Sequence, residues 1–223
     1  MNEGLPSSAG AMHPDRLFPA DPGTRAIART LYAQVRALPL ISPHGHTDPR
    51  WFATNEPFSD PASLLLTPDH YITRMLYSQG VALEALGVPA RDGSGARPEP
   101  RVIWRTFAAH YPLFRGTPTR LWLDWVLAEV FGIDAPLTPA NADRSFERIS
   151  ERLAEPAYRP RALFERFGIE VLATTESPST RSNTTPRFAP AAGRAASSAH
   201  IGRIRWSIRR LRASSPIWRA SAS

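Results

Sequence analysis

Two histidines separated by one glycine, His44 and His46, form the pattern in this sequence that points most directly to chemistry. They follow an apolar run at 40–42, which is bounded by prolines and predicts a buried strand. Side chains two residues apart on an extended chain share a face, so both imidazoles can approach one ion. Imidazole nitrogen suits zinc, iron or nickel, and a catalytic zinc usually has three protein ligands. The pattern predicts part of a metal site, and the alternative is a pair of loop histidines without a metal.

A second group of polar side chains lies near the start of a helix that is expected over 67–79. His70 and Arg74 are four residues apart and Tyr71 and Arg74 are three apart, so they are neighbours on the helix surface. The N-terminus of a helix favours anions, and this group would suit a substrate that carries a carboxylate. The alternative is ordinary helix chemistry, in which Asp69 interacts with the dipole, Tyr71 packs and Arg74 is solvated.

A third candidate, Glu176, stands at the end of an apolar run at 169–175 that predicts a second strand. A carboxylate at the C-terminal end of a barrel strand is a candidate for substrate binding or catalysis. The alternative is that Glu176 caps the helix that follows. His110 and the tryptophans between 104 and 125 are expected to pack a helical region and to have no catalytic role.

The elements that must position these residues run in the order strand, long helical stretch, strand. This order predicts an α/β fold, the N-terminal part of a (β/α)8 barrel like that of metal-dependent hydrolases, with a helical insertion after strand 1. The helix boundaries are predicted from hydroxyl residues at N-caps, prolines at helix starts and glycines at helix ends. The expected helices are 25–38, 67–79, 101–110, 118 to about 130, and one that starts at 139. Thr24 and Thr67 are the expected caps of the first two. The expected core residues on these helices are Ile103, Trp104, Phe107, Phe146, Ile149 and Leu153.

Composition excludes several classes of protein. The chain has no cysteine, which rules out disulfides and thiolate metal sites, and no apolar run approaches the length of a membrane span. All 27 basic residues are arginine, and nine of them lie in residues 179–223, where there is no aspartate or glutamate. Residues 1–178 therefore hold 18 basic and 20 acidic residues. The net charge of +7 therefore arises in the tail, and neither nucleic acid nor membrane is an expected partner. With no signal peptide visible, a cytoplasmic location is expected.

In order and spacing, several segments together resemble the uronate isomerases, also called glucuronate isomerases, of the amidohydrolase superfamily. The resemblance covers roughly residues 13–178. It rests on Leu38-Pro39-Leu40-Ile41-Ser42-Pro43-His44-Gly45-His46-Thr47-Asp48-Pro49, Asp69-His70-Tyr71 with Arg74, Gly80-Val81, Trp104, Leu121-Trp122-Leu123, Phe131-Gly132-Ile133 and Thr174-Thr175-Glu176-Ser177-Pro178.

This resemblance implies an aldose–ketose isomerase that acts on a small hexuronate, with D-glucuronate giving D-fructuronate and D-galacturonate giving D-tagaturonate. By the same resemblance His44 and His46 would hold a divalent metal, for which zinc is expected. His70 and Tyr71 would contact the substrate or transfer protons between C2 and C1 of the open-chain sugar. Arg74 and Glu176 would bind the substrate. A homo-oligomer is an option for a full-length member of the family.

The sequence divides into a lead-in at 1–23, an incomplete barrel at 24–178 with its helical insertion at about 82–160, and an irregular Arg/Ala/Ser-rich tail at 179–223. The family carries an Arg-containing segment after the second strand and a metal-binding aspartate late in the barrel, and neither is found here. One hypothesis is that a frameshift near 177–179 replaced the family sequence; the alternative is a genuine tail. Because a barrel closes only with its full set of strands, the chain as written is expected to be truncated, unstable and inactive.

Two other functions remain open beside the isomerase. One is a metal-dependent hydrolase of the same superfamily, although Asp69-His70-Tyr71 and the long helical insertion speak against it. The other is a non-catalytic fragment, including a binder of nucleic acid or anionic surfaces through the tail. Such binding would weaken with salt and would survive loss of residues 1–178.

Overall fold

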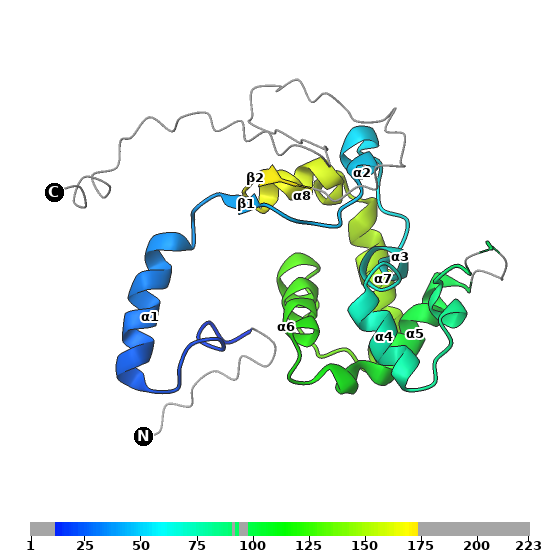
Figure 1. Ribbon diagram of the computed structural model, residues 1–223, viewed down its shortest axis with the longest axis horizontal. Helices are drawn as coiled ribbons and strands as arrows, with labels where there is room; N and C mark the ends of the chain where they lie inside the picture. The colour runs from blue at the N-terminus through cyan, green and yellow to red at the C-terminus, as the bar shows by residue number, and fades with distance from the viewer. Residues whose placement is uncertain (1–11, 91, 94–97, 174–223) are drawn as a thin grey trace. The chain divides into compact units, whose positions relative to one another are not determined.

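The computed structural model describes residues 12–90, 92, 93 and 98–173 (Figure 1). These residues form two compact units. The helical unit contains residues 12–40 and 54–169, and the strand unit contains residues 41–53 and 170–173. The tail from 179, with its proposed frameshift, lies outside the described residues.

Helices dominate the described part of the chain. The α-helices are α1 (Pro22–Val35), α2 (Pro49–Thr54), α3 (Pro61–Leu65), α4 (His70–Ser78), α5 (Pro100–His110), α6 (Pro118–Trp125), α7 (Ala142–Ala154) and α8 (Pro160–Arg166). Shorter 3-10 turns are Glu84–Leu86, Tyr111–Phe114, Pro139–Asn141 and Pro156–Tyr158, and a π-helical turn at Val126–Val130 continues α6. None of the helices in the described ranges combines the length and apolarity needed to cross a bilayer.

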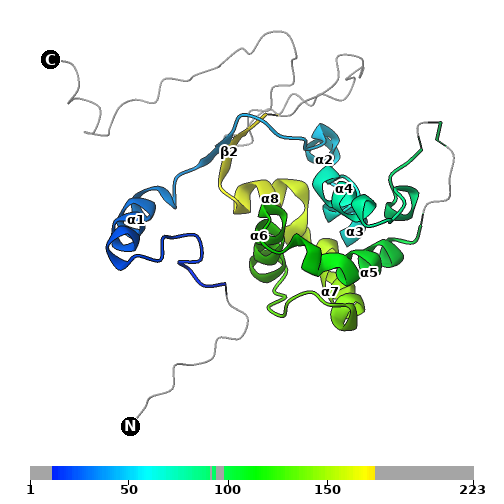
Figure 2. The same cartoon turned by 60° about the horizontal axis from the view of Figure 1, so that its bottom comes forward.

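The core of the helical unit lies where α3, α5 and α7 pack side by side (Figures 1 and 2). Its largest members are aromatic and come from α5 and the turn after it: Trp104, Phe107, Tyr111 and Phe114 are at most 1% exposed. All six core residues expected from helical periodicity are buried, so that prediction is confirmed. The buried stripes of α5 and α7 face each other because each helix is apolar at the three- and four-residue spacing that defines one face.

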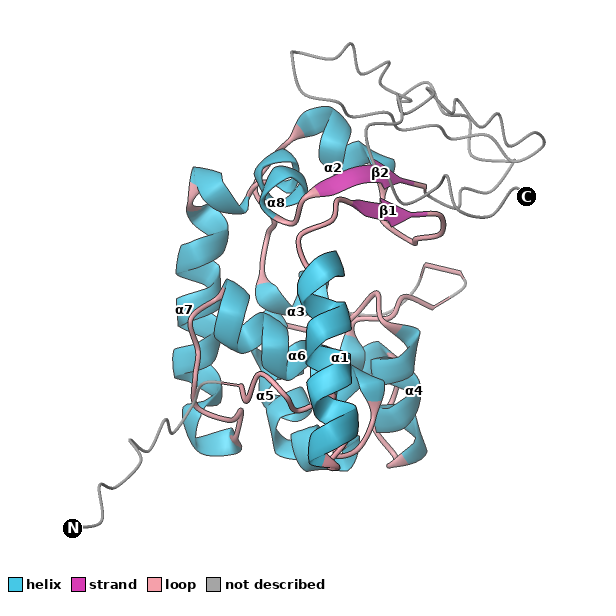
Figure 3. Cartoon of the chain, turned by 90° about the vertical axis from the view of Figure 1, so that its left-hand side faces the viewer, coloured by secondary structure: helices cyan, strands magenta, loops and turns pink. Residues whose placement is uncertain are grey.

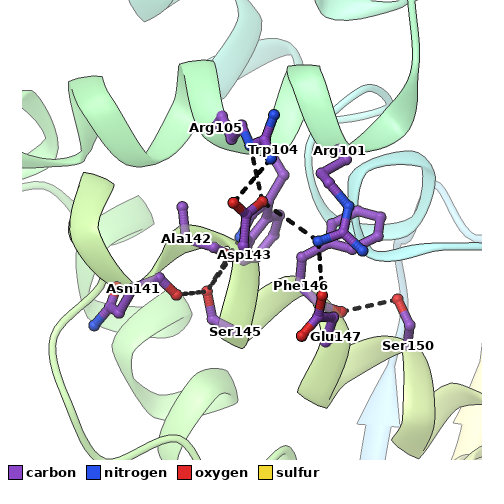
Figure 4. A network of polar contacts seen from close by, with 10 residues as sticks. All are labelled: Arg101, Trp104, Arg105, Asn141, Ala142, Asp143, Ser145, Phe146, Glu147 and Ser150. Carbon is purple, nitrogen blue, oxygen red and sulfur yellow. Dashed lines mark hydrogen bonds and ion pairs between the residues drawn. The ribbon is translucent and has the colours of Figure 1, made fainter.

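Polar contacts also link α5 to α7 (Figure 4). The buried indole N–H of Trp104 donates to the Ser145 hydroxyl at 3.2 Å. At the surface, the Asp143 carboxylate accepts from Arg105 at 2.8 Å and from Arg101 at 3.4 Å. The hydrogen bond from Arg105 lowers the pKa of Asp143. Exposed ion pairs contribute little to stability, so these arginines fix the register of the two helices more than they hold them together.

Two strands, β1 (Leu40–Ser42) and β2 (Ile169–Leu172), form a two-stranded sheet (Figure 3). The Leu40 N–H donates to the Gly168 carbonyl at 2.8 Å, and the Ala173 N–H donates to the Ser42 carbonyl at 2.9 Å. Residue numbers increase in the same direction along both strands, so the strands run parallel. Helices α2 to α8 lie between them in the sequence, and α1 precedes β1. This confirms a helix-rich α/β fold in which a strand, a long helical stretch and a second strand follow one another.

Two helix starts differ from the predictions. Helix α1 begins at Pro22 because the Asp21 carboxylate, not Thr24, is the cap and accepts from the Thr24 N–H at 2.7 Å. It also ends at Val35, before the predicted 38. Helix α4 begins at His70, where the Asp69 carboxylate accepts the N–H groups of Tyr71 and Ile72. The Thr67 hydroxyl instead donates to the Leu86 carbonyl at 2.9 Å. The helix begins three residues later, so Thr67 does not occupy its N-cap position.

Other helix signals were interpreted correctly. The Thr117 hydroxyl accepts from the Arg120 N–H at 3.2 Å, and Thr138 forms a capping box with Asn141. Gly80 and Gly132 have φ of 87° and 69°, as left-handed stops require. The expected burial of β1 is wrong for the described residues. Leu40 and Ile41 are 54% and 60% exposed, because β2 is the only strand beside β1 in the described ranges.

Candidate metal and substrate site

The strand unit presents its two histidines directly after β1. The Ser42 hydroxyl donates to the His44 carbonyl at 3.1 Å, which turns the chain as it leaves the strand. Both imidazoles are exposed, with their planes at 71° and their Nε2 atoms 3.1 Å apart. This distance allows a hydrogen bond between the two Nε2 atoms, and the tautomer decides which ring donates. Neutral imidazole nitrogens of this kind are also common metal ligands.

The separation of these nitrogens fits a shared metal ion. Two imidazole nitrogens at about 2.0–2.1 Å from a tetrahedral zinc stand roughly 3.3 Å from each other, close to the distance found here. Within the described ranges, no cluster of three or more His, Asp or Glu side chains could hold a metal. The nearby Asp48 carboxylate accepts from Arg50 at 2.6 Å, and this hydrogen bond lowers the pKa of Asp48. The strand unit thus offers two candidate ligands, His44 and His46, and their role at a metal stays a prediction.

Gly45 allows the chain to bend close to β2. A Cβ atom at this position would lie 3.2 Å from the Ala173 carbonyl oxygen, which is tighter than nine in ten real Cβ contacts. With any larger residue the neighbouring chain would have to shift by a few tenths of an ångström.

Zinc binding to the chain should depend on both imidazoles. We expect His44→Ala and His46→Ala each to raise the zinc dissociation constant roughly tenfold or more, because each removes one of two nitrogen ligands. Competition with a chromophoric chelator measures the constant. His110→Ala is the matched control, since its Nδ1 lies 2.8 Å from the Thr106 carbonyl within α5. An equal effect of all three substitutions would show that binding is nonspecific.

In the helical unit, Asp69 fixes the start of α4 and so the direction of the residues that follow. The side chains of His70, Tyr71 and Arg74 are exposed, while Ile72, Thr73 and Leu76 are buried on the other side of the helix. The rings of His70 and Tyr71 are stacked at a tilt of 33°, with centroids 4.3 Å apart. The three exposed side chains therefore share the solvent face at the N-terminal end of α4.

The ordinary interpretation of this helix start holds only in part, and the substrate-binding interpretation stays a prediction. The dipole role of Asp69 is confirmed as capping through two hydrogen bonds at 2.8 and 3.2 Å. Tyr71 is 66% exposed and contacts His70, so it does not pack in the core as the ordinary alternative requires. The importance of Asp69 as the residue that orients the group was missed; its signal was an acidic side chain directly before the first helical residue.

The structure assembles the predicted residues in two separate local groups. His44 and His46 belong to the strand unit, and His70, Tyr71 and Arg74 belong to the helical unit. Glu176 lies outside the described residues. The fold and these groups define the class of the molecule: a helix-rich α/β protein with an exposed histidine pair, suited to a metal, at a strand end.

Comparisons with known proteins identify the family. The family model for glucuronate isomerase matches residues 23–185. A uronate isomerase of Rhizorhabdus wittichii is 65% identical over 167 residues, which cover 75% of this chain and 34% of that protein. The crystal structure of glucuronate isomerase from Caulobacter crescentus matches 84% of this chain and 40% of the Caulobacter chain. Its TM-score is 0.77 and its sequence identity is 54%. The crystal structure of a uronate isomerase from Thermotoga maritima matches 74% of this chain and 34% of the Thermotoga chain. Its TM-score is 0.63 and its sequence identity is 26%.

The chain belongs to the glucuronate isomerase family, as the resemblance of its motifs indicated. It spans about a third of the length of the curated relatives that it matches. The family match ends at residue 185, inside the segment from 179 that was predicted to depart from the family. The boundary at 178 and the frameshift stay predictions.

Proposed function

We propose that this chain carries the first part of a uronate isomerase active site, for the interconversion of D-glucuronate and D-fructuronate and of D-galacturonate and D-tagaturonate. The observation that carries the proposal is the pair of Nε2 atoms, 3.1 Å apart, directly after β1 in a segment that the family model covers. The full-length protein would complete a (β/α)8 barrel, with β1 and β2 as its first strands. A small hexuronate is the proposed partner and the cytoplasm the proposed location.

His44 and His46 would hold the metal, for which zinc is the proposed identity. When bound, a divalent metal polarises a substrate oxygen and stabilises negative charge that develops on it. The two imidazoles suit this role because both are exposed and their Nε2 atoms lie 3.1 Å apart. The remaining protein ligand of a catalytic zinc would come from outside the described residues.

His70 and Tyr71 would move the protons. The reaction takes a proton from C2 and returns one to C1, and it transfers the hydroxyl proton from the C2 oxygen to the C1 oxygen. An imidazole next to a phenol, with rings 4.3 Å apart, offers a base and an acid at neighbouring positions. Arg74, on the same exposed face, would bind the substrate carboxylate, and the N-terminus of α4 would favour the same charge. Glu176 is proposed to contact the sugar hydroxyls.

A chimaera tests the proposal. Residues 1–173 are joined to the Caulobacter crescentus protein from the position that aligns with residue 174 onward, so that this protein also supplies the counterpart of Glu176. We expect the chimaera to isomerise D-glucuronate in the presence of zinc, and His44→Ala to lower the rate at least about a hundredfold. His110→Ala is the control, because His110 lies on α5 and belongs to neither group. A folded chimaera with no isomerase activity, or one that is active as a hydrolase, would contradict the proposal.

The chain alone is expected to remain inactive toward D-glucuronate at any zinc concentration. Measurable turnover by the isolated chain would refute its description as an incomplete barrel. No observation favours the hydrolase alternative over the isomerase, since the relatives that the chain matches are named as isomerases.

A further inference from the structure

Helix α1 presents an apolar stripe to solvent. Ile27, Leu31 and Val35 recur at four-residue intervals and fall within about 80° of one another around the helix. Leu38 follows in the turn after the helix. These four side chains, here called the α1 face, are 64%, 60%, 53% and 61% exposed, and no residue of α1 is buried.

The other side of α1 is already occupied. The Arg29 guanidinium forms an ion pair with Asp15, and the Tyr32 ring contacts Phe18 edge-on at 5.8 Å. At about 100° per residue, Arg29 points away from the α1 face, as do Arg25 and Arg36. Helix α1 thus has a charged side in water and an apolar side without a partner in the described part of the chain. Amphipathic helices bury such a stripe, and a contiguous exposed apolar patch marks an interaction surface.

The family comparison indicates what covers this stripe. Helix α1 lies almost wholly inside the match at 23–185, so it is an element of the family fold and not an addition to it. The relatives have about two thirds of their length beyond the part that this chain matches. The sheet also has open edges. In the described ranges, each of its two strands has one edge without a strand beside it.

We infer that the α1 face is a docking surface for the barrel segments that longer family members possess beyond the matched part. It binds these segments even when they are supplied as a separate polypeptide, so that the two chains assemble one barrel. The inference rests on the proposed function in so far as both need a completed barrel. Association and catalysis are nevertheless measured separately.

Co-expression of two chains tests the inference. The full 223-residue chain carries an affinity tag, and its partner is the portion of the Caulobacter crescentus protein outside the aligned 40%, with no tag. We expect the partner to co-purify with the tagged chain. Leu31→Asp should weaken this association roughly tenfold or more, because a carboxylate would have to be buried in an apolar interface.

Ala33→Asp is the matched control, since it introduces the same charge in α1 on the side away from the α1 face. Neither position is buried, so far-UV circular dichroism should show the same helix content for both variants. Co-purification without isomerase activity would support docking and count against the proposed function. An active chimaera beside two chains that fail to associate would overturn the docking inference alone. Equal effects of the two aspartates, or self-association of the chain that Leu31→Asp abolishes, would also overturn it.

Discussion

Tyr71→Phe in the chimaera is expected to lower kcat for D-glucuronate by roughly 10²–10⁴-fold, the range of a lost general acid or base. The substitution removes one hydroxyl and keeps the ring, so the contact with His70 at 4.3 Å and the capping of α4 by Asp69 should persist. KM should change little, because the carboxylate is bound by other groups. Steady-state kinetics with zinc present measure both constants.

Tyr77→Phe is the matched control for this prediction. Tyr77 lies on the same helix and is 60% exposed, close to the 66% of Tyr71, so the two substitutions change the same atom in similar surroundings. The control should keep full activity. If Tyr71→Phe retains a normal kcat, the proton-transfer role is wrong. If it raises KM alone, Tyr71 binds substrate without taking part in the proton steps.

Local chemistry explains which features could be predicted from the sequence. The histidine pair was found because an apolar run and a two-residue spacing suffice to place both rings on one side of the chain. The buried faces of α5 and α7 were found because helical periodicity depends only on neighbouring residues. The strand–helices–strand order follows from the same local patterns. None of these features needs knowledge of distant contacts.

The errors arose where a second residue competed for the same role. Thr67 has the hydroxyl and the proline of a helix start, yet its hydroxyl donates to the Leu86 carbonyl, nineteen positions away, and Asp69 caps α4 instead. Helix α1 is likewise capped three residues before the predicted cap, because the Asp21 carboxylate accepts both the N–H and the hydroxyl of Thr24. The exposure of Leu40 depends on what lies beside β1, and a pattern within the strand contains no such information.

Trp104→Ala is expected to destabilise the helical unit by about 3–5 kcal/mol, the cost of truncating a large buried aromatic side chain. Trp104 is fully buried, and its ring centroid lies 6.0 Å from that of Phe107 and 6.4 Å from that of Phe146. Ser145 keeps hydrogen bonds to the Asn141 and Ala142 carbonyls, so no buried hydroxyl is left without a partner. The cost should therefore arise mainly from the cavity between α5 and α7.

Urea unfolding of the chain, followed by far-UV circular dichroism, measures this change. A loss of this size is a large part of the 5–15 kcal/mol that typically stabilises a domain, so the milder Trp104→Phe is made as well. Trp125→Ala is the control, since it removes the same side chain where it is 38% exposed. It should cost clearly less, because part of that surface is already in water and the cavity opens to solvent. Equal losses at 104 and 125 would mean that the contact between α5 and α7 is not the centre of the core.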